Sequence, residues 1–176
     1  MTELETGTVE GIFTTQQAGQ PMRALTEAVA VADRGLVGDR YHDERGFYSE
    51  RPMPDGGRQL TLVEAEVLES LAVEHGILLT PIESRRNVVT RGVRLHDLIG
   101  KRFRVGPLLC EGTRVCEPCV RLEELTGKPV NEPLVHRGGL RIRILEGGIL
   151  RIGDRVRLTE AAEQVAVVAP VRSTSH

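Results

Sequence analysis

Apolar residues occur along the chain in short runs, most of which a glycine or a proline closes. Residues 7–13 and 24–31 combine β-branched and other apolar side chains, which favours strands over helices. The same pattern returns in the second half of the chain and predicts strands at residues 87–90, 102–105, 108–111, 140–145 and 155–158. The chain is therefore predicted to be mainly β.

Helical periodicity is strongest after Thr61. The Thr61 hydroxyl can cap the next amides while Glu64 reaches back, as in a capping box, and Gly76 supplies a residue that tolerates positive φ just past His75. The apolar stripe of this predicted helix consists of Val67, Leu68, Leu71 and Ala72. We therefore expect a helix from about residue 61 to about residue 75.

Shorter helical segments are expected at residues 95–99 and after Pro118. In the second of these, Val120, Leu122 and Leu125 are expected to face inward. Beyond residue 158 the sequence is consistent with one helical turn, an edge strand at 165–168 and a disordered end from residue 172.

A loop is predicted between residues 43 and 57, which are rich in glycine, proline and charge, and long loops of this kind often carry function. Many short strands, few helices and 19 glycines favour a closed or nearly closed mixed β-barrel over a βαβ sheet. The length of 176 residues fits one domain, which we place at 1–160, followed by a partly disordered C-terminal extension at 161–176.

Composition narrows the classes of partner. Because 23 Lys and Arg residues stand against 25 Asp and Glu residues and aromatic residues are few, nucleic acid is not an expected partner. No apolar stretch approaches the roughly 20 residues that cross a bilayer, and the acidic N-terminus does not resemble a signal peptide. We expect a cytoplasmic protein with no membrane partner.

The most specific local motif is the segment 113–119, where Cys116 and Cys119 lie three residues apart and Pro118 precedes the second cysteine. A proline suits the first position of a helix, which would place Cys119 near unpaired backbone amides. Those amides, with a nearby Arg114 or Arg121, would favour a thiolate, the form that carries sulfur, attacks electrophiles or binds a soft metal. Cys119 is therefore the predicted catalytic residue.

Other interpretations of the cysteines remain open. Two cysteines at this spacing are half of a tetrahedral zinc site, which Cys110 and His136 could complete only by folding close to them. A thioredoxin-like dithiol is disfavoured by the β-rich surroundings. Cys110 alone fits a small buried hydrophobic residue.

A second candidate region is Glu83-Ser-Arg-Arg-Asn87, which precedes a predicted strand. The paired guanidinium groups of Arg85 and Arg86 suit planar or phosphate oxygens. The same residues also fit a solvated strand start with Glu83 as the ionic partner. The glycine-containing stretches 38–42, 134–139 and 147–154 predict turns.

Taken together in chain order, several motifs resemble the MOSC domain family, named after the C-terminal domain of molybdenum cofactor sulfurase, and specifically a small stand-alone bacterial-type member. The motifs are Gly38-Asp-Arg, Arg58-Gln-Leu-Thr-Leu-Val, Ser84-Arg-Arg-Asn-Val-Val-Thr-Arg-Gly92, Leu98-Ile-Gly-Lys-Arg-Phe-Arg-Val-Gly106, Cys116-Glu-Pro-Cys119 and Gly147-Gly-x-x-Arg-x-Gly-Asp154. The resemblance implies a mixed β-barrel like that of pyruvate kinase, and a cleft that in several members binds the pyranopterin molybdenum cofactor.

The resemblance also implies roles for individual residues. Cys119 matches the cysteine that ligates molybdenum or carries sulfur as a persulfide in such members. Arg85 and Asn87 match the Arg-x-Asn piece expected to hold the pterin phosphate or its ring edge, and Arg86 and Arg137 are further candidates for the same pocket. Pyridoxal phosphate is not expected, because the desulfurase domain that precedes MOSC in eukaryotic sulfurases is not seen here.

Three functions follow as hypotheses. The first is a cofactor-binding protein that reduces N-hydroxylated or N-oxide substrates with electrons from a separate electron-transfer protein, since no flavin, haem or iron–sulfur motif is present. The second is a non-catalytic sulfur or cofactor carrier supplied by a cysteine desulfurase or another sulfur donor, with Cys116 able to resolve a persulfide on Cys119. The third is a zinc- or disulfide-stabilised barrel that binds a small anion at Arg85 and Arg86.

Overall fold

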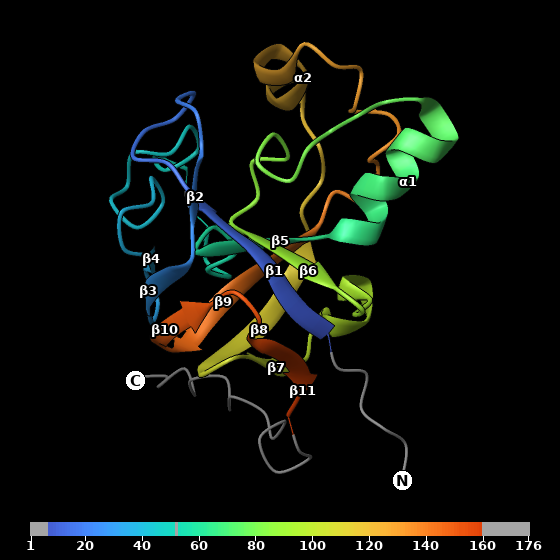
Figure 1. Ribbon diagram of the computed structural model, residues 1–176. Helices are drawn as coiled ribbons and strands as arrows, with labels where there is room; N and C mark the ends of the chain where they lie inside the picture. Colours follow the sequence, from blue (N-terminus) through green and yellow to red (C-terminus); the bar gives the residue numbers. More distant parts are fainter. Residues whose placement is uncertain (1–6, 52, 160–176) are drawn as a thin grey trace, which may run out of the picture.

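A closed barrel of seven strands forms the centre of the molecule in the computed structural model, which describes residues 7–51 and 53–159 (Figure 1). The barrel strands are β1 (Gly7–Thr14), β5 (Leu60–Glu64), β6 (Val88–Arg91), β7 (Arg102–Val105), β8 (Leu108–Val115), β9 (Leu140–Glu146) and β11 (Arg155–Leu158). They pair in the order β11-β7-β8-β9-β5-β6-β1, and β1 pairs with β11 to close the ring. Only β5 and β6 run parallel, so the barrel is mixed, as the sequence predicts.

Strands outside the barrel extend one side of it. A short strand, β2 (Arg23–Leu25), pairs with the end of β1, while β10 (Gly148–Arg151), β3 (Glu27–Val31) and β4 (Gly35–Leu36) form a separate three-stranded sheet. The predicted single strand at 24–31 is therefore two strands, because the chain leaves the barrel sheet at Thr26 and joins the second one. β4 and β10 were not predicted as strands, since their glycines suggested only turns.

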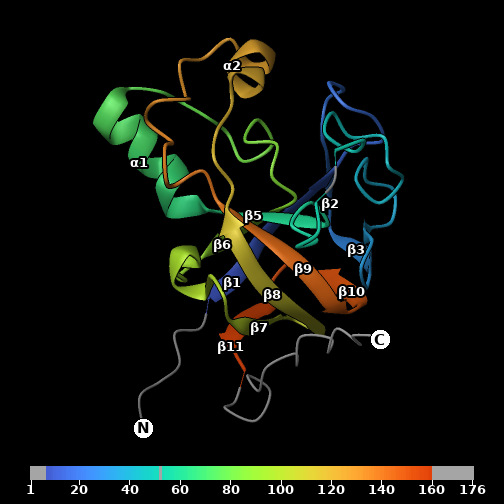
Figure 2. The same ribbon diagram turned by 180° about the vertical axis from the view of Figure 1, so that it is seen from behind.

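Two hydrophobic clusters hold these elements together. The barrel interior is filled by fully buried side chains such as Phe103, Ile142 and Ile144, together with Cys110. A second cluster lies outside the barrel beneath the helices and includes Leu71 of α1 (Ala65–His75) and Leu122 of α2 (Val120–Thr126). Both α-helices lie at the same end of the barrel, opposite the end where β7 and β11 meet (Figures 1 and 2).

The helices differ in detail from the prediction. Thr61 lies inside β5 and the helix begins at Ala65, with Glu64 at the N-cap and no side-chain cap, so the predicted capping box is wrong. The Thr61 hydroxyl is used within the sheet instead, where it accepts from the Asn87 amide and donates to Asn87 Oδ1, each at 3.2 Å. Gly76 does end α1 in the left-handed region, at φ 65°, as predicted.

The shorter helical predictions fare similarly. Residues 95–99 contain the 3₁₀ helix η1 (Leu95–Leu98), and α2 follows Pro118 as expected. However, Val120 is 60% exposed and Leu125 is 37% exposed, so only Leu122 is buried. The predictions for residues 160–176 fall outside the described residues. Among the described helices, none has the length and apolar character required to cross a membrane.

Candidate functional site

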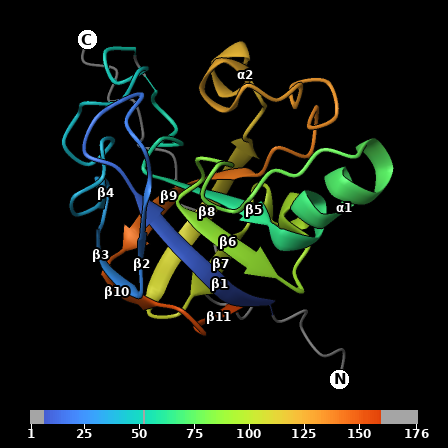
Figure 3. The same ribbon diagram turned by 45° about the horizontal axis from the view of Figure 1, so that its top comes forward.

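A cavity of about 540 Å³ opens at the helical end of the barrel, between α2 and the loop of residues 37–59. Figure 3 shows this loop and α2 facing each other across that end. The volume lies within the range typical of small-molecule sites. The described residues of the loop predicted between 43 and 57 form no helix or strand, and they supply one wall of the cavity.

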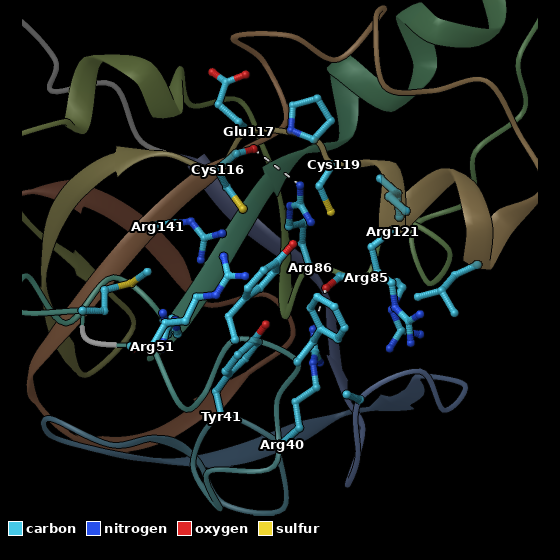
Figure 4. A pocket seen from close by; sticks show the side chains of 18 of the residues that line it. Arg40, Tyr41, Arg51, Arg85, Arg86, Cys116, Glu117, Cys119, Arg121 and Arg141 are labelled. Atoms are coloured by element: carbon cyan, nitrogen blue, oxygen red, sulfur yellow. Dashed lines mark hydrogen bonds between the residues drawn. The ribbon is translucent and has the colours of Figure 1, made fainter.

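Both cysteines of the segment 113–119 line the cavity. β8 ends at Val115, and the amide of Cys116 continues the ladder by donating to the carbonyl of Gly139 at 2.7 Å. Cys119 is the N-cap of α2 and its carbonyl accepts from the Leu122 amide at 2.9 Å. Pro118 therefore lies one residue before the N-cap rather than at the first helical position. The Cys119 side chain makes no capping hydrogen bond, and both sulfur atoms point into the cavity (Figure 4).

Arginine dominates the rest of the lining. The cavity is lined by the eight arginines Arg40, Arg51, Arg58, Arg85, Arg86, Arg114, Arg121 and Arg141. Among the described lining residues the one carboxylate is that of Glu117, which accepts from His136 at 3.0 Å and points away from the guanidinium groups (Figure 4). The cavity is therefore strongly cationic and suits an anionic ligand.

Arg85 and Arg40 are positioned by the backbone around them. Arg85 has a left-handed φ of 59°, a conformation that costs free energy for a side chain of this size and is concentrated at functional sites. It donates to the carbonyl of Gln20 at 2.8 Å, while Arg40 donates to the Arg85 carbonyl at 3.4 Å. Burial, followed by the neighbouring charge of Arg40, lowers the pKa of Arg85 to about 10. The buried Asp39 carboxylate holds Arg40 at 3.4 Å.

A tyrosine from the loop lines the cavity beside the candidate thiol. The pKa of Tyr48 is raised, first by burial and then by the neighbouring Cys119. Arg51 lies over the Tyr48 ring at 5.1 Å from its centroid. The loop therefore brings a phenol next to the sulfur atom that the sequence singles out.

The structure brings together Cys119, Arg85 and Arg86 but places Asn87 and Arg137 elsewhere. The amide of Asn87 is 1% exposed, accepts from Thr61 and donates to the Phe13 carbonyl, which ties β5 to β1. Arg137 pairs with Glu74 at 2.9 Å and lines a smaller cavity of about 380 Å³. Neither side chain is among the residues that line the cavity of Cys119.

The ligands considered for zinc also lie apart. Cys110 is buried in the barrel interior, whereas His136 is largely exposed and contacts Glu117. All three cysteines are free thiols, and the described residues contain no group of three or more His, Cys, Asp or Glu side chains that could hold a metal ion.

Several lining residues were missed by the sequence analysis, notably Tyr48, Arg51, Arg58 and Arg141. Arg141 follows the turn that enters β9, and the others belong to the loop of residues 37–59. The available signal was the combination of aromatic residues and arginines within that loop. No spacing rule connects it with a strand more than 80 residues away.

Solved structures with the same fold include the YuaD protein from Bacillus subtilis, which aligns over 89% of this chain and 97% of its own with a TM-score of 0.73 and 17% identity. YiiM from Geobacillus stearothermophilus aligns over 88% of this chain and 75% of its own, with a TM-score of 0.64 and 13% identity. YiiM from Escherichia coli aligns over 86% and 69%, with a TM-score of 0.61 and 18% identity. These similarities establish the fold alone.

No curated protein matches the sequence. The family model for the MOSC domain does match it, over residues 40–157, which is more than half of the chain. That match covers the loop from residue 40, the two cavity cysteines, five of the seven barrel strands in full and all but the last residue of β11. On this evidence the chain belongs to the MOSC domain family.

Proposed function

We propose that the protein binds the pyranopterin molybdenum cofactor in the cavity between α2 and the loop of residues 37–59, with Cys119 as the molybdenum ligand. The observation that carries the proposal is that one cavity combines the Cys119 thiol with eight arginines. A thiolate is a soft ligand suited to such a metal, and guanidinium groups suit the phosphate of the pterin. The MOSC family is associated with this cofactor, which is consistent with the donor set.

Different residues of the chain would hold different parts of the cofactor. Arg85 and Arg40, which are packed against one another, would hold the phosphate, and Arg86 would fix the backbone that presents the cysteines. Tyr48 would hold a proton next to the Cys119 sulfur. The bound cofactor would supply two-electron reduction of N-hydroxylated or N-oxide substrates, with electrons from a separate electron-transfer protein.

A second candidate function is sulfur carriage, which is favoured by the presence of Cys116 in the same cavity. In this function a cysteine desulfurase or another sulfur donor would leave a persulfide on Cys119. Attack of the Cys116 thiolate on the Cys119 sulfur would release hydrosulfide and leave a Cys116–Cys119 disulfide, so atoms and electrons balance. The disulfide would then be reduced by an external thiol before the next cycle.

The two functions are separated by expressing the protein in a host that makes the molybdenum cofactor and measuring the molybdenum and pterin content. We expect near-stoichiometric molybdenum in the wild type and a loss of about tenfold or more in Cys119→Ser. Cys110→Ala is the matched control, because it removes a thiol that lies in the barrel interior and should retain the cofactor. Absence of molybdenum and pterin in the wild type would reject the first function.

Sulfur carriage has its own measurement. Intact mass after incubation with a cysteine desulfurase and cysteine should show one added sulfur atom on the wild type and none on Cys119→Ser. In Cys116→Ser the added sulfur should persist longer, because the resolving thiol is missing. Equal lifetimes in the wild type and Cys116→Ser would assign no role to Cys116.

A further inference from the structure

Six of the eight arginines of the cavity form two groups of three on opposite sides of it. The first group, here called the α2-side cluster, consists of Arg40, Arg85 and Arg121. The pKa of Arg85 is lowered first by burial and then by the charges of Arg40 and Arg121, so the three guanidinium groups are electrostatic neighbours. This is the cluster to which the proposed function assigns the cofactor phosphate.

The second group, here called the loop-side cluster, consists of Arg51, Arg58 and Arg141. The pKa of Arg58 is lowered, first by burial and then by the charges of Arg141, Arg114 and Arg51. Arg51 and Arg141 lie together in Figure 4, on the side of the cavity away from Arg85 and Arg121. The loop and β9 therefore bring three cations together against their mutual repulsion.

Aromatic rings and the candidate thiol lie between the two clusters. Arg40 of the α2-side cluster lies over the Tyr41 ring at 4.7 Å, and Arg51 of the loop-side cluster lies over the Tyr48 ring at 5.1 Å. Tyr48 in turn is a neighbour of Cys119, which contributes to raising the pKa of its phenol. A molecule bound at Cys119 would therefore have one cationic cluster on each side.

The loop-side cluster has no carboxylate counter-ion among the described residues. In the described part of the molecule, none of its three arginines forms an ion pair with a carboxylate, whereas the adjacent Arg114 pairs with Asp55 at 3.5 Å. The Nε atom of Arg58 is buried and has no hydrogen-bond partner. Uncompensated charge and an unused buried donor are costly, and an anion in the cavity would offset both.

We propose that the loop-side cluster is a substrate subsite that binds an oxyanion group, a carboxylate or a phosphate, on the opposite side of Cys119 from the cofactor phosphate. The inference rests on the proposed function and adds the substrate class, since it requires the reducible substrate to carry a negative charge. Two anions repel each other strongly at short distance. Binding the cofactor phosphate and the substrate anion at separate cationic clusters reduces that repulsion.

The test is a calorimetric titration of the whole protein with inorganic phosphate, before and after loading with cofactor. We expect the cofactor-free protein to bind two phosphate ions and the loaded protein to bind one. Arg141→Gln should weaken the site that remains in the loaded protein about tenfold or more, because a charge-assisted hydrogen bond is lost. Arg157→Gln, on the exposed face of β11, is the matched control and should leave both sites unchanged.

Arg51→Gln provides a second test at an exposed loop position, and it should act in the same direction. A parallel titration with benzoate distinguishes the two kinds of oxyanion. A site for carboxylates should bind benzoate, whereas a site for phosphates should prefer the phosphate dianion. The subsite is rejected if both variants bind phosphate like the wild type. It is also rejected if Arg141→Gln loses molybdenum and pterin as completely as Arg85→Gln, since the cluster would then hold the cofactor.

Failure of the proposed function gives a different result. If the wild type purified from every host lacks molybdenum, the cofactor proposal fails. The phosphate titration of the cofactor-free protein then still tests the loop-side subsite. Two phosphate sites, one lost in Arg141→Gln and the other in Arg85→Gln, would support the loop-side subsite alone. A single site, or sites that do not respond to Arg141→Gln, would overturn it.

Discussion

The guanidinium group of Arg86 donates to the backbone carbonyl of Cys116 at 3.4 Å and to that of Gly138 at 2.8 Å. A third hydrogen bond goes to the carbonyl of Ser84 at 3.4 Å. One side chain therefore joins the start of β6 to the cysteine segment and to the turn that enters β9. This gives Arg86 a positioning role, since three of its five N–H groups bind backbone oxygens.

We predict that Arg86→Lys lowers the free energy of unfolding by about 2 kcal/mol, because a lysine cannot span three carbonyls and leaves buried acceptors without donors. Chemical denaturation measures the change. Arg157→Lys, on an exposed strand face, should stay within about 0.5 kcal/mol of the wild type. Equal stability of Arg86→Lys and the wild type would contradict the role of the fork-shaped guanidinium.

The three thiols should differ in their reactivity toward iodoacetamide in the native protein. Cys119 is half-buried in the cavity, Cys116 is 2% exposed, and Cys110 is fully buried in the barrel. Burial raises the pKa of Cys110, which keeps it a neutral and unreactive thiol. Peptide mapping should therefore find Cys119 alkylated first and Cys110 alkylated about tenfold or more slowly.

The control for this experiment is the unfolded protein, in which all three thiols should react at similar rates. Native labelling of Cys110 as fast as that of Cys119 would mean that the barrel opens on the timescale of the reaction. Faster labelling of Cys116 than of Cys119 would reverse their proposed roles as resolving and acceptor thiols.

The strands of the barrel were predictable because each alternates or repeats apolar residues between glycines and prolines. β7 and β11 have the predicted bounds, and β9 differs by one residue. β8 extends from the predicted end at residue 111 to Val115 because its second half pairs with β9, where Arg114 lies opposite Arg141. That pairing is a tertiary contact which local patterning does not contain.

The site was predictable only in part. The spacing of Cys116 and Cys119 and the paired Arg85 and Arg86 are local signals, and the fold brings all four into one cavity. The Arg-x-Asn pattern also led to Asn87, yet its side chain donates to the Phe13 carbonyl inside the fold while that of Arg86 turns toward the cysteines. Burial of the amide was not visible from sequence, because the Asn87 partners lie 26 and 74 residues away.

We predict that Asn87→Ala destabilises the fold without a specific effect on the cavity. Its amide joins Thr61 of β5 to Phe13 of β1, and the substitution leaves these buried backbone groups unpaired. The expected loss is about 2–4 kcal/mol by chemical denaturation. If instead the molybdenum content falls while the stability is unchanged, the Asn87 amide contacts the cofactor, as the family resemblance implies.

Gly139 should tolerate no side chain. It has a φ of 118°, and a Cβ atom there would lie 2.1 Å from the backbone oxygen of Leu62 on the paired strand β5. Gly139→Ala is expected to cost about 2–5 kcal/mol. Gly127 is the matched control, because its φ of 67° is also positive but open space surrounds it, so Gly127→Ala should cost only about 1 kcal/mol. If Gly139→Ala and Gly127→Ala lose equal stability, the close approach of the Leu62 carbonyl is not the cause of the loss.

An ion pair joins two of the segments that border the cavity. Lys128, just after α2, contacts both carboxylate oxygens of Glu83, at 2.8 and 2.9 Å, and Thr80 donates to the same carboxylate. The hydrogen bond from Lys128, followed by that from Thr80, lowers the pKa of Glu83 from 4.5 to about 2. The ionised carboxylate is therefore the form that the folded protein favours.

The stabilisation by Glu83 should depend on pH with a definite sign. Because the folded pKa is depressed, the contribution is fully present above about pH 4.5 and is lost as the pH falls toward 2. Glu83→Gln should lower the free energy of unfolding at neutral pH by about 1 kcal/mol at most, since both partners are about one-third exposed and screened by solvent. Denaturation at neutral pH and at about pH 3 should show this difference shrinking.

Two further variants isolate the ion pair. Glu50→Gln, in the exposed part of the loop, removes a carboxylate that forms no ion pair among the described residues, and it should show no such pH dependence. Lys128→Met should reproduce the loss, and combining it with Glu83→Gln should add little, because both remove the same interaction. A difference between Glu83→Gln and the wild type that persists undiminished in acid would show that the stabilisation does not come from the charge of the Glu83 carboxylate.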